Sequence, residues 1–396
     1  MKIGIWLGDR IVKDIGGGAS YVLRLIQMID QYKFSDGIDI CFITFVPQRS
    51  LTKDVINISF FPPFLYRSIS KSEFLSRILM RMDRTFIQKC GLNRLLSSHG
   101  IKIIYYLNQA YCFDPSFPFI STNWDIGHRS THSFPELIDD GSFERRERFY
   151  SNILPKALMI ICESETGKKE LMDYTKIGAH KIRVMPMFAG GVILFDVTAE
   201  ESQSMLEKYG LKKNHYFFYP AQFWAHKNHV GVLEAFAKYL NNDGSFKLIF
   251  TGSDKGNLKY VKQKSIDLGI EKNVLFLGFI PIKTMTALYK NAHCLIMASH
   301  FGPTNMPPIE AMELGCPVIC SDLGGHKEIL GESGLYFNSY DPDSIYEAMV
   351  KITSNREFFV NKITEQRSKT FFNDKFAIRK LDSILQEVVR IRKNWD

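Results

Sequence analysis

Residues 301–322 place an acidic side chain beside the expected start of a helix. The segment runs Phe301-Gly-Pro-Thr-Asn-Met-Pro-Pro-Ile-Glu310, after which Gly315 and Pro317 stop the helix and an apolar strand follows. We expect the helix to open at residues 307–308, with Glu310 in its first turn. Helix starts bind anions because their N–H groups are unpaired and the helix dipole is positive there. A carboxylate beside them suits ribose hydroxyls, so the segment predicts a sugar-nucleotide site.

A second group of reactive side chains lies in Tyr219-Pro-Ala-Gln-Phe-Trp-Ala-His226-Lys227-Asn228-His229, at a strand end and before a helix. Lys227 carries a flexible point charge that suits a leaving diphosphate. The alternative for a lone lysine is a solvent-facing side chain. The surrounding aromatic residues and histidines argue against a plain surface loop.

Asp125 and His128 follow an expected strand of the first half, in the segment 122–129. A carboxylate and an imidazole at a strand end can orient a transferred sugar or assist an acceptor hydroxyl as a general base. A structural hydrogen bond between the two side chains is the alternative.

Three consecutive glycines, at 16–18, separate the first strand from an amphipathic helix. Glycines let the backbone approach a ligand closely, and the helix start then offers N–H groups. The alternative is a tight strand-to-helix turn. The spacing is not G-x-G-x-x-G, so it does not indicate a nicotinamide cofactor.

Strands and helices alternate along the chain, which favours an α/β fold of two doubly wound, Rossmann-like domains with a cleft between them. We place the first domain at residues 1–195 and the second at 196–375, with the boundary in a polar, glycine-containing stretch. Helical segments, among them Phe143–Ile153, lie between the expected strands. A last amphipathic helix, Asn373–Asp396, packs either on its own domain or on the first one. The expected strands are Lys2–Leu7, Ile38–Phe45, Ile101–Leu107, Phe119–Asn123, Leu158–Cys162, Lys181–Met185, Tyr216–Tyr219, Lys247–Thr251, Val274–Leu277, Cys294–Met297, Val318–Ser321 and Leu335–Phe337.

The composition of the 396 residues, with 45% hydrophobic and 23% charged side chains, is ordinary for a globular chain. Neither a signal peptide nor a run of about twenty apolar residues is visible, so we expect a cytoplasmic protein. The seven cysteines are scattered and fit no zinc pattern, which predicts reduced thiols and no metal site.

The net charge of +8 is unevenly distributed. The stretch 67–102 has apolar residues at helical spacing, which predicts an amphipathic helix. Either this helix packs on a domain core with its basic face in solvent, or its basic face binds anionic lipid at the inner face of the membrane. Nothing in the chain indicates nucleic-acid binding. The basic residues of this stretch are Arg67, Lys71, Arg77, Arg81, Arg84, Lys89, Arg94 and Lys102.

In the order and spacing of its motifs, the second half resembles the retaining glycosyltransferases of family 4, which have the two-domain GT-B fold. The resemblance covers residues 216–350 firmly and the first domain loosely. Its motifs are the Lys227-Asn228 pair before Leu233-Glu-Ala-Phe236, Phe250-Thr-Gly252, Gly278-Phe-Ile, Leu288-Tyr-Lys-Asn-Ala292, Ala298-Ser299, the helix containing Glu310 with Gly315-Cys-Pro-Val-Ile, and Gly324-Gly325…Glu328.

The resemblance implies transfer of a sugar from a nucleoside-diphosphate sugar to a hydroxyl with retention, without a tightly bound metal or cofactor. It implies that Glu310 binds ribose and that the last helix crosses back to the first domain. The other donor-binding residues that it implies are Gly17, Gly18, Lys227, Asn305 and Met306. To these we add Gln222 and Thr304, from their positions in the same motifs, as donor-binding candidates. The catalytic candidates are Lys227 and, from the residues alone, Asp125 and His128.

Two positions depart from the family pattern. Gly302 stands where the family usually has a first glutamate, and Gln222 stands where it usually has an arginine. We expect a backbone donor or another polar side chain to compensate for the lost cation, with Thr304, Asn305 or His226 as candidates.

The sequence therefore predicts a glycosyltransferase acting on a glycan or lipid-linked acceptor, in cell-surface polysaccharide or O-antigen-type biosynthesis. A sugar-nucleotide epimerase and a non-catalytic binding subunit on the same scaffold remain as alternatives. A hydrophobic acceptor entrance along residues 60–65 and a buried core loop are equally compatible with that apolar run.

Overall fold

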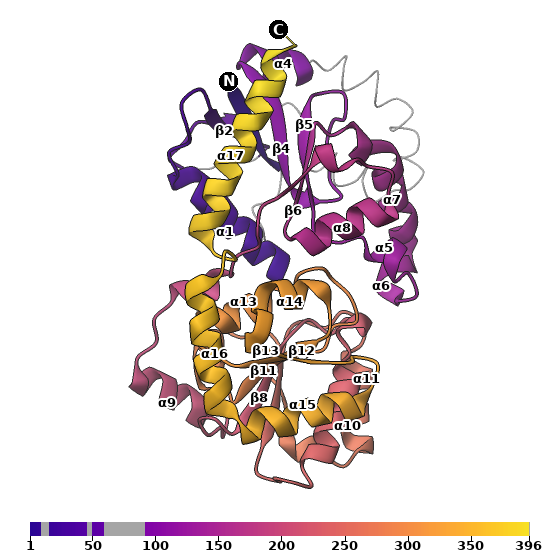
Figure 1. Ribbon diagram of the computed structural model, residues 1–396, viewed down its shortest axis with the longest axis vertical. Coiled ribbons are helices and arrows are strands. Elements are labelled where there is room, and N and C mark those ends of the chain that lie inside the picture. The colour runs from indigo at the N-terminus through magenta and orange to yellow at the C-terminus, as the bar shows by residue number, and fades with distance from the viewer. Residues whose placement is uncertain (9–15, 46–49, 59–91, 396) are drawn as a thin grey trace.

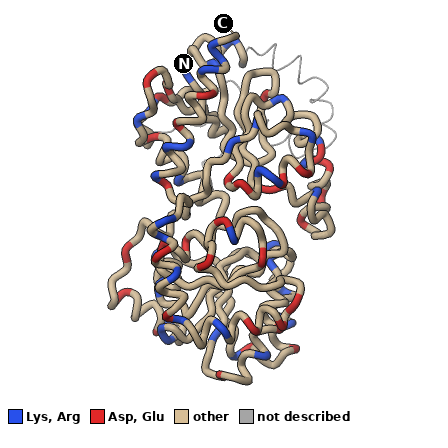
Figure 2. The backbone as a smooth tube through the Cα atoms, viewed as in Figure 1, with Lys and Arg blue, Asp and Glu red and all other residues tan. Residues whose placement is uncertain are grey.

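The protein consists of two α/β domains arranged end to end, each built on one parallel sheet (Figure 1). The computed structural model describes residues 1–8, 16–45, 50–58 and 92–395. Both chain termini lie at the far end of the first domain (Figure 1). Among the described residues, charged side chains are spread over the outer helices and loops of both domains, and the strands carry few of them (Figure 2).

The first domain contains a seven-stranded sheet in the order β3-β2-β1-β4-β5-β6-β7. Every neighbouring pair is parallel. The order reverses at β1 and β4, which makes the sheet doubly wound and places a ligand crevice at the carboxyl ends of these strands. The strands are β1 (Lys2–Gly8), β2 (Asp39–Thr44), β3 (Val55–Asn57), β4 (Ile101–Gln109), β5 (Phe119–Asn123), β6 (Met159–Cys162) and β7 (Ile182–Val184).

The second domain contains a six-stranded sheet in the order β10-β9-β8-β11-β12-β13, again parallel throughout. Its order reverses at β8 and β11. The predicted α/β fold of two doubly wound domains is confirmed. The strands are β8 (Tyr216–Pro220), β9 (Lys247–Thr251), β10 (Val274–Phe276), β11 (Cys294–Met297), β12 (Val318–Ser321) and β13 (Gly334–Phe337).

Most strands are short apolar runs that are buried on both sides, as expected for parallel sheets covered by helices. Among the described residues, the covering helices are α1 (Gly17–Gln31), α4 (Leu92–Ser98), α5 (Gly127–Ser130), α6 (Pro135–Ile138), α7 (Ser142–Arg148), α8 (Glu165–Tyr174), α9 (Ala199–Lys208), α10 (His229–Tyr239), α11 (Leu258–Asp267), α12 (Ile282–Asn291), α13 (Met306–Glu313), α14 (Gly324–Leu330), α15 (Pro342–Ser354), α16 (Arg356–Lys369) and α17 (Asp374–Lys393).

The final helix, α17, crosses back and packs on the first domain beside α1 (Figure 1). Asn373 caps its first turn by accepting a hydrogen bond from the Phe376 N–H at 2.9 Å. Its buried face joins the same apolar cluster as Ile3 and Tyr21 of the first domain. The crossing helix implied by the family resemblance is therefore present, and the first domain is completed by the end of the chain.

Replacing Leu385 with alanine should destabilise the first domain by about 2–5 kcal/mol, because the side chain is fully buried in that cluster. Hydrogen exchange of β1 and α1 would measure the loss. Ser383→Ala on the exposed face of the same helix is the matched control. Unchanged protection of β1 and α1 in Leu385→Ala would contradict the packing of α17 on the first domain.

Three features differ from the sequence-based expectations. The strand β3 was missed because it has only three residues, and the helix α9 was missed because its residues were assigned to a polar boundary. The helix expected over residues 143–153 is divided into α7 and one turn of π-helix, Phe149–Ile153.

The domain boundary at residues 195–196 stays a prediction, since residues 185–215 carry no strand of either sheet. Most of the basic stretch 67–102 and the apolar run 60–65 lie outside the described residues. Among the helices that the structure does describe, none is long and apolar enough to span a membrane.

Candidate active site

Two adjoining cavities lie between the domains, at the carboxyl ends of both sheets. The first, of about 370 Å³, is lined by the start of α1, by the loops after β8, β9 and β10, and by Glu310. The second, of about 360 Å³, is lined by the loops after β5, β6 and β11 and by Lys227. The cavities adjoin because both are lined by Gly17, Gln222 and Met306.

Lys227 is half-buried and points toward the start of α13. Its Nζ donates hydrogen bonds to Asn305 Oδ1 at 2.7 Å and to Ser299 Oγ at 3.3 Å. Burial lowers the pKa of Lys227 to about 8. Apart from His226, it is the only basic side chain among the described residues that line the two cavities. The cleft therefore presents one mobile cation beside a helix start, which is an arrangement that binds diphosphate.

Asn305 is oriented by a chain of hydrogen bonds from the second sheet. Because its Oδ1 accepts from Lys227, its amide group must donate to His326 Nε2, which lies 3.0 Å away. His326 Nδ1 then carries the proton and donates to the Ser321 carbonyl at 2.8 Å. Burial lowers the pKa of His326 to about 4, so the imidazole is neutral. Sequence reasoning did not identify His326 as a residue that positions Lys227.

Glu310 is buried against the segment that links the domains. It accepts hydrogen bonds from Tyr289 Oη at 2.7 Å and from the Gly190 N–H at 3.2 Å. Burial raises its pKa in spite of these bonds. The expected position in the first turn is wrong: α13 begins at Met306, so Glu310 lies in the second turn. Its carboxylate still lines the first cavity, because the second turn of α13 faces the start of α1.

The glycines at the start of α1 bring this helix close to the second domain. A Cβ atom at Gly17 would lie 3.3 Å from Met306 Cε, and one at Gly18 would lie 3.0 Å from Trp124 Cζ3. Side chains at 17 and 18 would therefore crowd the walls of the second cavity, which both glycines line.

Gln222 and His226 do not provide a second cation. Gln222 accepts a hydrogen bond from Trp224 Nε1 at 3.0 Å and donates to Ser253 Oγ at 3.2 Å. His226 is held by Glu136 of the first domain, which accepts from its N–H at 3.0 Å and from its Nδ1. Burial, reinforced by Lys227, lowers the pKa of His226 to about 4, so this ring is neutral at pH 7. Gln222 offers an amide at the junction of the cavities instead of the usual guanidinium.

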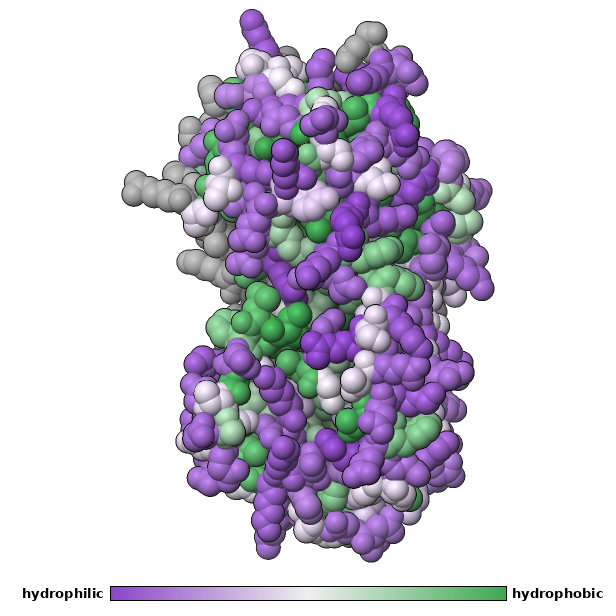
Figure 3. All heavy atoms as spheres, turned by 60° about the vertical axis from the view of Figure 1, so that its left-hand side comes forward, coloured by the Kyte–Doolittle hydropathy of each residue, from purple (hydrophilic) through white to green (hydrophobic). Residues whose placement is uncertain are grey.

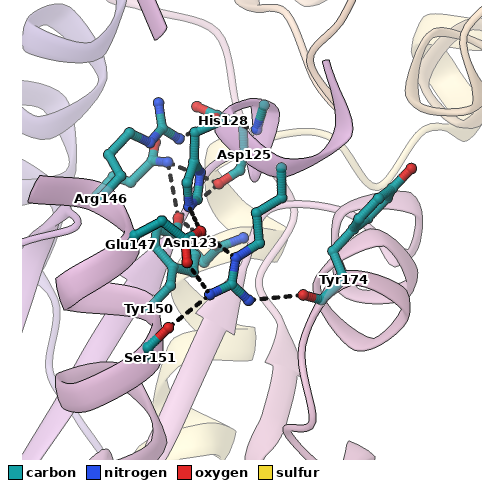
Figure 4. A network of polar contacts seen from close by, with 11 residues as sticks. Asn123, Asp125, His128, Arg146, Glu147, Tyr150, Ser151 and Tyr174 are labelled. Carbon is teal, nitrogen blue, oxygen red and sulfur yellow. Dashed lines mark hydrogen bonds and ion pairs between the residues drawn. The ribbon is translucent and has the colours of Figure 1, made fainter. Parts of the chain in front are cut away.

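Asp125 lines the second cavity and forms an ion pair with Arg146 of α7 (Figure 4). The carboxylate also accepts a hydrogen bond from the Gly127 N–H at 2.9 Å. Burial alone would raise its pKa, but the charge of Arg146 and the hydrogen bonds from Gly127 and Arg146 together outweigh burial and hold the pKa below its ordinary value. Asp125 is therefore an anion at neutral pH, suited to accept hydrogen bonds from sugar hydroxyls.

His128 is not brought to either cavity. The side chain is fully buried, packs against Tyr150 with 4.7 Å between the ring centroids and the rings tilted by 48°, and lies 3.2 Å from Glu147 (Figure 4). Burial, aided by Arg146, lowers its pKa to about 4. The alternative of a hydrogen bond between Asp125 and His128 is also not observed: Asp125 pairs with Arg146 and His128 lies beside Glu147, both of α7. His128 supports the loop that carries Asp125 and does not face a ligand.

Several contacts join the domains around the cleft. Thr304 Oγ1 donates a hydrogen bond to Glu163 Oε2 at 3.1 Å. The loop after β6 therefore contacts the loop before α13. Glu328 of α14 accepts hydrogen bonds from the N–H groups of Glu165 and Thr166, each at 2.9 Å, at the start of α8. Sequence reasoning missed Glu163, although an acidic residue directly after the apolar strand β6 was a visible signal.

The outer rim of the first cavity is apolar. Leu23, Phe279 and Ile282 line it with 41%, 64% and 36% of their surfaces exposed. Hydrophobic atoms gather on this side of the molecule at the level where the domains meet (Figure 3). Flat apolar walls next to a carboxylate suit a nucleoside, whose base stacks and whose ribose forms hydrogen bonds.

Comparison with known proteins places this geometry in a family. Residues 201–369, which carry the Lys227 loop, α13 and Glu310, match the model of the family described as glycosyl transferases group 1. In this part the chain is similar to the group 1 glycosyl transferases. The match covers most of the second domain, where the sequence resemblance was also firm.

The curated relatives of this chain align over only part of their length. An uncharacterized glycosyltransferase of Methanocaldococcus jannaschii is 30% identical over 168 residues, covering 41% of this chain and 40% of that protein. The O-antigen chain mannosyltransferase B of Escherichia coli is 25% identical over 228 residues, covering 57% and 58%. The chain thus spans about half the length of the curated relatives it matches.

Solved structures extend the likeness over the whole fold. The sucrose-phosphate synthase from Thermosynechococcus elongatus superposes with a TM-score of 0.75 at 17% identity, covering 98% of this chain and 99% of that one. At this identity the likeness concerns the fold alone, and the predicted two-domain GT-B architecture is confirmed.

Proposed function

We propose that this protein transfers a hexose, with retention of configuration, from a nucleoside-diphosphate sugar to a hydroxyl of a glycan or lipid-linked acceptor. The observation that carries the proposal is the junction of the two cavities at the start of α13, with Glu310 in one and Lys227 in the other. We assign the nucleoside to the first cavity and the diphosphate and sugar to the second.

In this assignment the bond between the anomeric carbon and the diphosphate breaks, and negative charge grows on the departing oxygen. Lys227 and the N–H groups of Asn305 and Met306 are placed to stabilise that charge. The acceptor hydroxyl oxygen bonds to the anomeric carbon and gives its proton to the departing diphosphate. Asp125 holds a sugar hydroxyl, and His128 keeps Asp125 in place.

The predicted absence of a resident metal and of a tightly bound cofactor is part of the proposal. Among the described residues, no group of three or more histidine, cysteine, aspartate or glutamate side chains is arranged to hold a metal ion. Lys227 and the helix start would then stabilise the leaving group without a metal ion. Full transfer activity after chelation with EDTA is the expected result, measured as nucleoside-diphosphate release.

We further propose a role in cell-surface polysaccharide or O-antigen-type biosynthesis, with mannose as the first donor sugar to test. An O-antigen mannosyltransferase among the relatives supports this choice. We place the protein in the cytoplasm, at the inner face of the membrane, where the basic residues of the sequence 67–102 would meet anionic headgroups and a lipid-linked acceptor.

Glu310→Ala should weaken binding of the matching nucleoside diphosphate by about 10- to 100-fold, because a charged acceptor of the ribose hydroxyls is lost. Isothermal titration calorimetry with UDP, GDP and ADP measures this. Tyr289→Phe removes the hydroxyl group that donates a hydrogen bond to Glu310 but keeps the Glu310 carboxylate. This variant should therefore retain affinity for the nucleoside diphosphate within about threefold. A Glu310→Ala variant that binds as tightly as the wild type would refute the assignment of the first cavity.

A further inference from the structure

Glu163 is a buried carboxyl group that lines the second cavity and has one oxygen without a hydrogen-bond partner among the described residues. It directly follows β6, at the carboxyl end of the first sheet, and only 2% of its surface is exposed. Oε2 accepts the hydrogen bond from Thr304, whereas Oε1 is buried and has no hydrogen-bond partner among the described residues. Buried polar atoms in folded proteins are nearly always paired, so an unpaired one that lines a cavity indicates a ligand.

The surroundings of Glu163 indicate what that ligand offers. The same cavity is lined by Lys227, Asn305 and Asp125. Burial raises the pKa of Glu163 to about 8, with a contribution from the negative charge of Asp125. At neutral pH the group is therefore a neutral acid that can both donate and accept a hydrogen bond. A sugar hydroxyl, which also does both, is its natural partner.

The loop that faces Glu163 carries a glycine, and no carboxylate, at position 302. Gly302 has φ of +112°, a backbone conformation that residues with a side chain rarely adopt. This is also the position at which the family usually has a glutamate. Thr304, two residues further on, reaches Glu163 across the cleft. A carboxyl group thus arrives at this loop from the first domain instead of from the loop itself.

We propose that Glu163 binds a hydroxyl of the donor sugar and so supplies, from the first domain, the carboxyl group that the second domain lacks at Gly302. The inference rests on the proposed function. The sugar-binding part of the site is then complete only when the domains are together, whereas the first cavity binds the nucleoside without Glu163, which does not line it.

The test compares Glu163→Ala, Glu163→Gln and the wild type for nucleoside-diphosphate release from GDP-mannose and UDP-glucose. Glu163→Ala should lower kcat/KM by about 30-fold or more, with binding of GDP or UDP alone unchanged within about twofold. Glu163→Gln should retain most of the activity, because an amide also donates and accepts.

The 2-, 3-, 4- and 6-deoxy analogues of the preferred donor identify the hydroxyl. With one analogue the effect of Glu163→Ala should fall to about threefold or less, since the contact is already absent. Glu328→Ala is the matched control, because it removes another contact between the domains and lies outside both cavities. It should not discriminate among the analogues.

The outcomes separate the two proposals. A wild type that releases no nucleoside diphosphate from any donor overturns the proposed function and the assignment of Glu163 with it. If the wild type is active and Glu163→Ala is equally active, only the assignment of Glu163 is overturned. The same holds if Glu163→Ala is impaired equally on every analogue and also in binding of nucleoside diphosphate alone. An effect confined to the KM of the acceptor also overturns it.

Discussion

Lys227→Ala should lower the rate of sugar transfer by about 100- to 1,000-fold, the loss typical when one preorganised donor to a developing negative charge is removed. The side chain touches Asn305 and Ser299 and lines the cavity at the start of α13. The measurement is kcat for nucleoside-diphosphate release from the preferred donor. Lys212→Ala, at an exposed lysine of the same domain, is the matched control and should leave kcat unchanged.

The pH dependence provides a second measurement on the same residue. Since burial lowers the pKa of Lys227 to about 8, the charged form that binds diphosphate is lost as the pH rises through 8. Affinity for nucleoside diphosphate should therefore fall from pH 7 to pH 9, and Lys227→Arg, which stays charged, should abolish that fall. Wild-type kcat in Lys227→Ala, or the same pH profile in Lys227→Arg, would contradict the role given to this cation.

Gly325→Ala should be the most destabilising single change in the second domain. A Cβ atom at this position would lie 1.1 Å from the carbonyl oxygen of Pro303, so either α14 or the loop before α13 must move. Overpacking of this kind costs about 3 kcal/mol, which corresponds to a fall in Tm of about 6–10 °C for a domain of this size. Differential scanning calorimetry measures the shift.

The displaced loop should also impair the site, because Thr304 and Asn305 lie next to Pro303. Gly244→Ala is the matched control: its added Cβ would lie 3.7 Å from the nearest atom, the Leu240 carbonyl oxygen. This control should change Tm by about 1 °C or less. Equal Tm values for the two variants would show that the close approach of α14 to this loop is not maintained in solution.

The local pattern of apolar residues was sufficient to predict most strands of the two sheets. It was insufficient to predict very short or polar elements. The strands β9, β11 and β12 were predicted with their observed bounds, because their apolar side chains are buried on both faces. The three-residue strand β3 has too few residues to show a period. Glu310 was predicted in the first turn of its helix and lies in the second, because α13 begins at Met306, one residue before its two prolines. The conformation of the preceding loop decides where the helix begins.

The sequence by itself predicted the fold class, the resemblance to a glycosyltransferase family and three residues that line the two cavities. Lys227, Asn305 and Glu310 each belong to a strand–loop–helix segment, and the loop at the carboxyl end of a parallel strand must open toward the crevice.

Only the tertiary structure decided which side chains are free to act. Asp125 pairs with Arg146, His226 with Glu136, and Glu163 keeps one oxygen unpaired beside Thr304. The partners of His226 and Glu163 lie on the opposite domain, at large sequence separation. No local period or motif records such a contact, because it arises when two independently patterned domains close on each other.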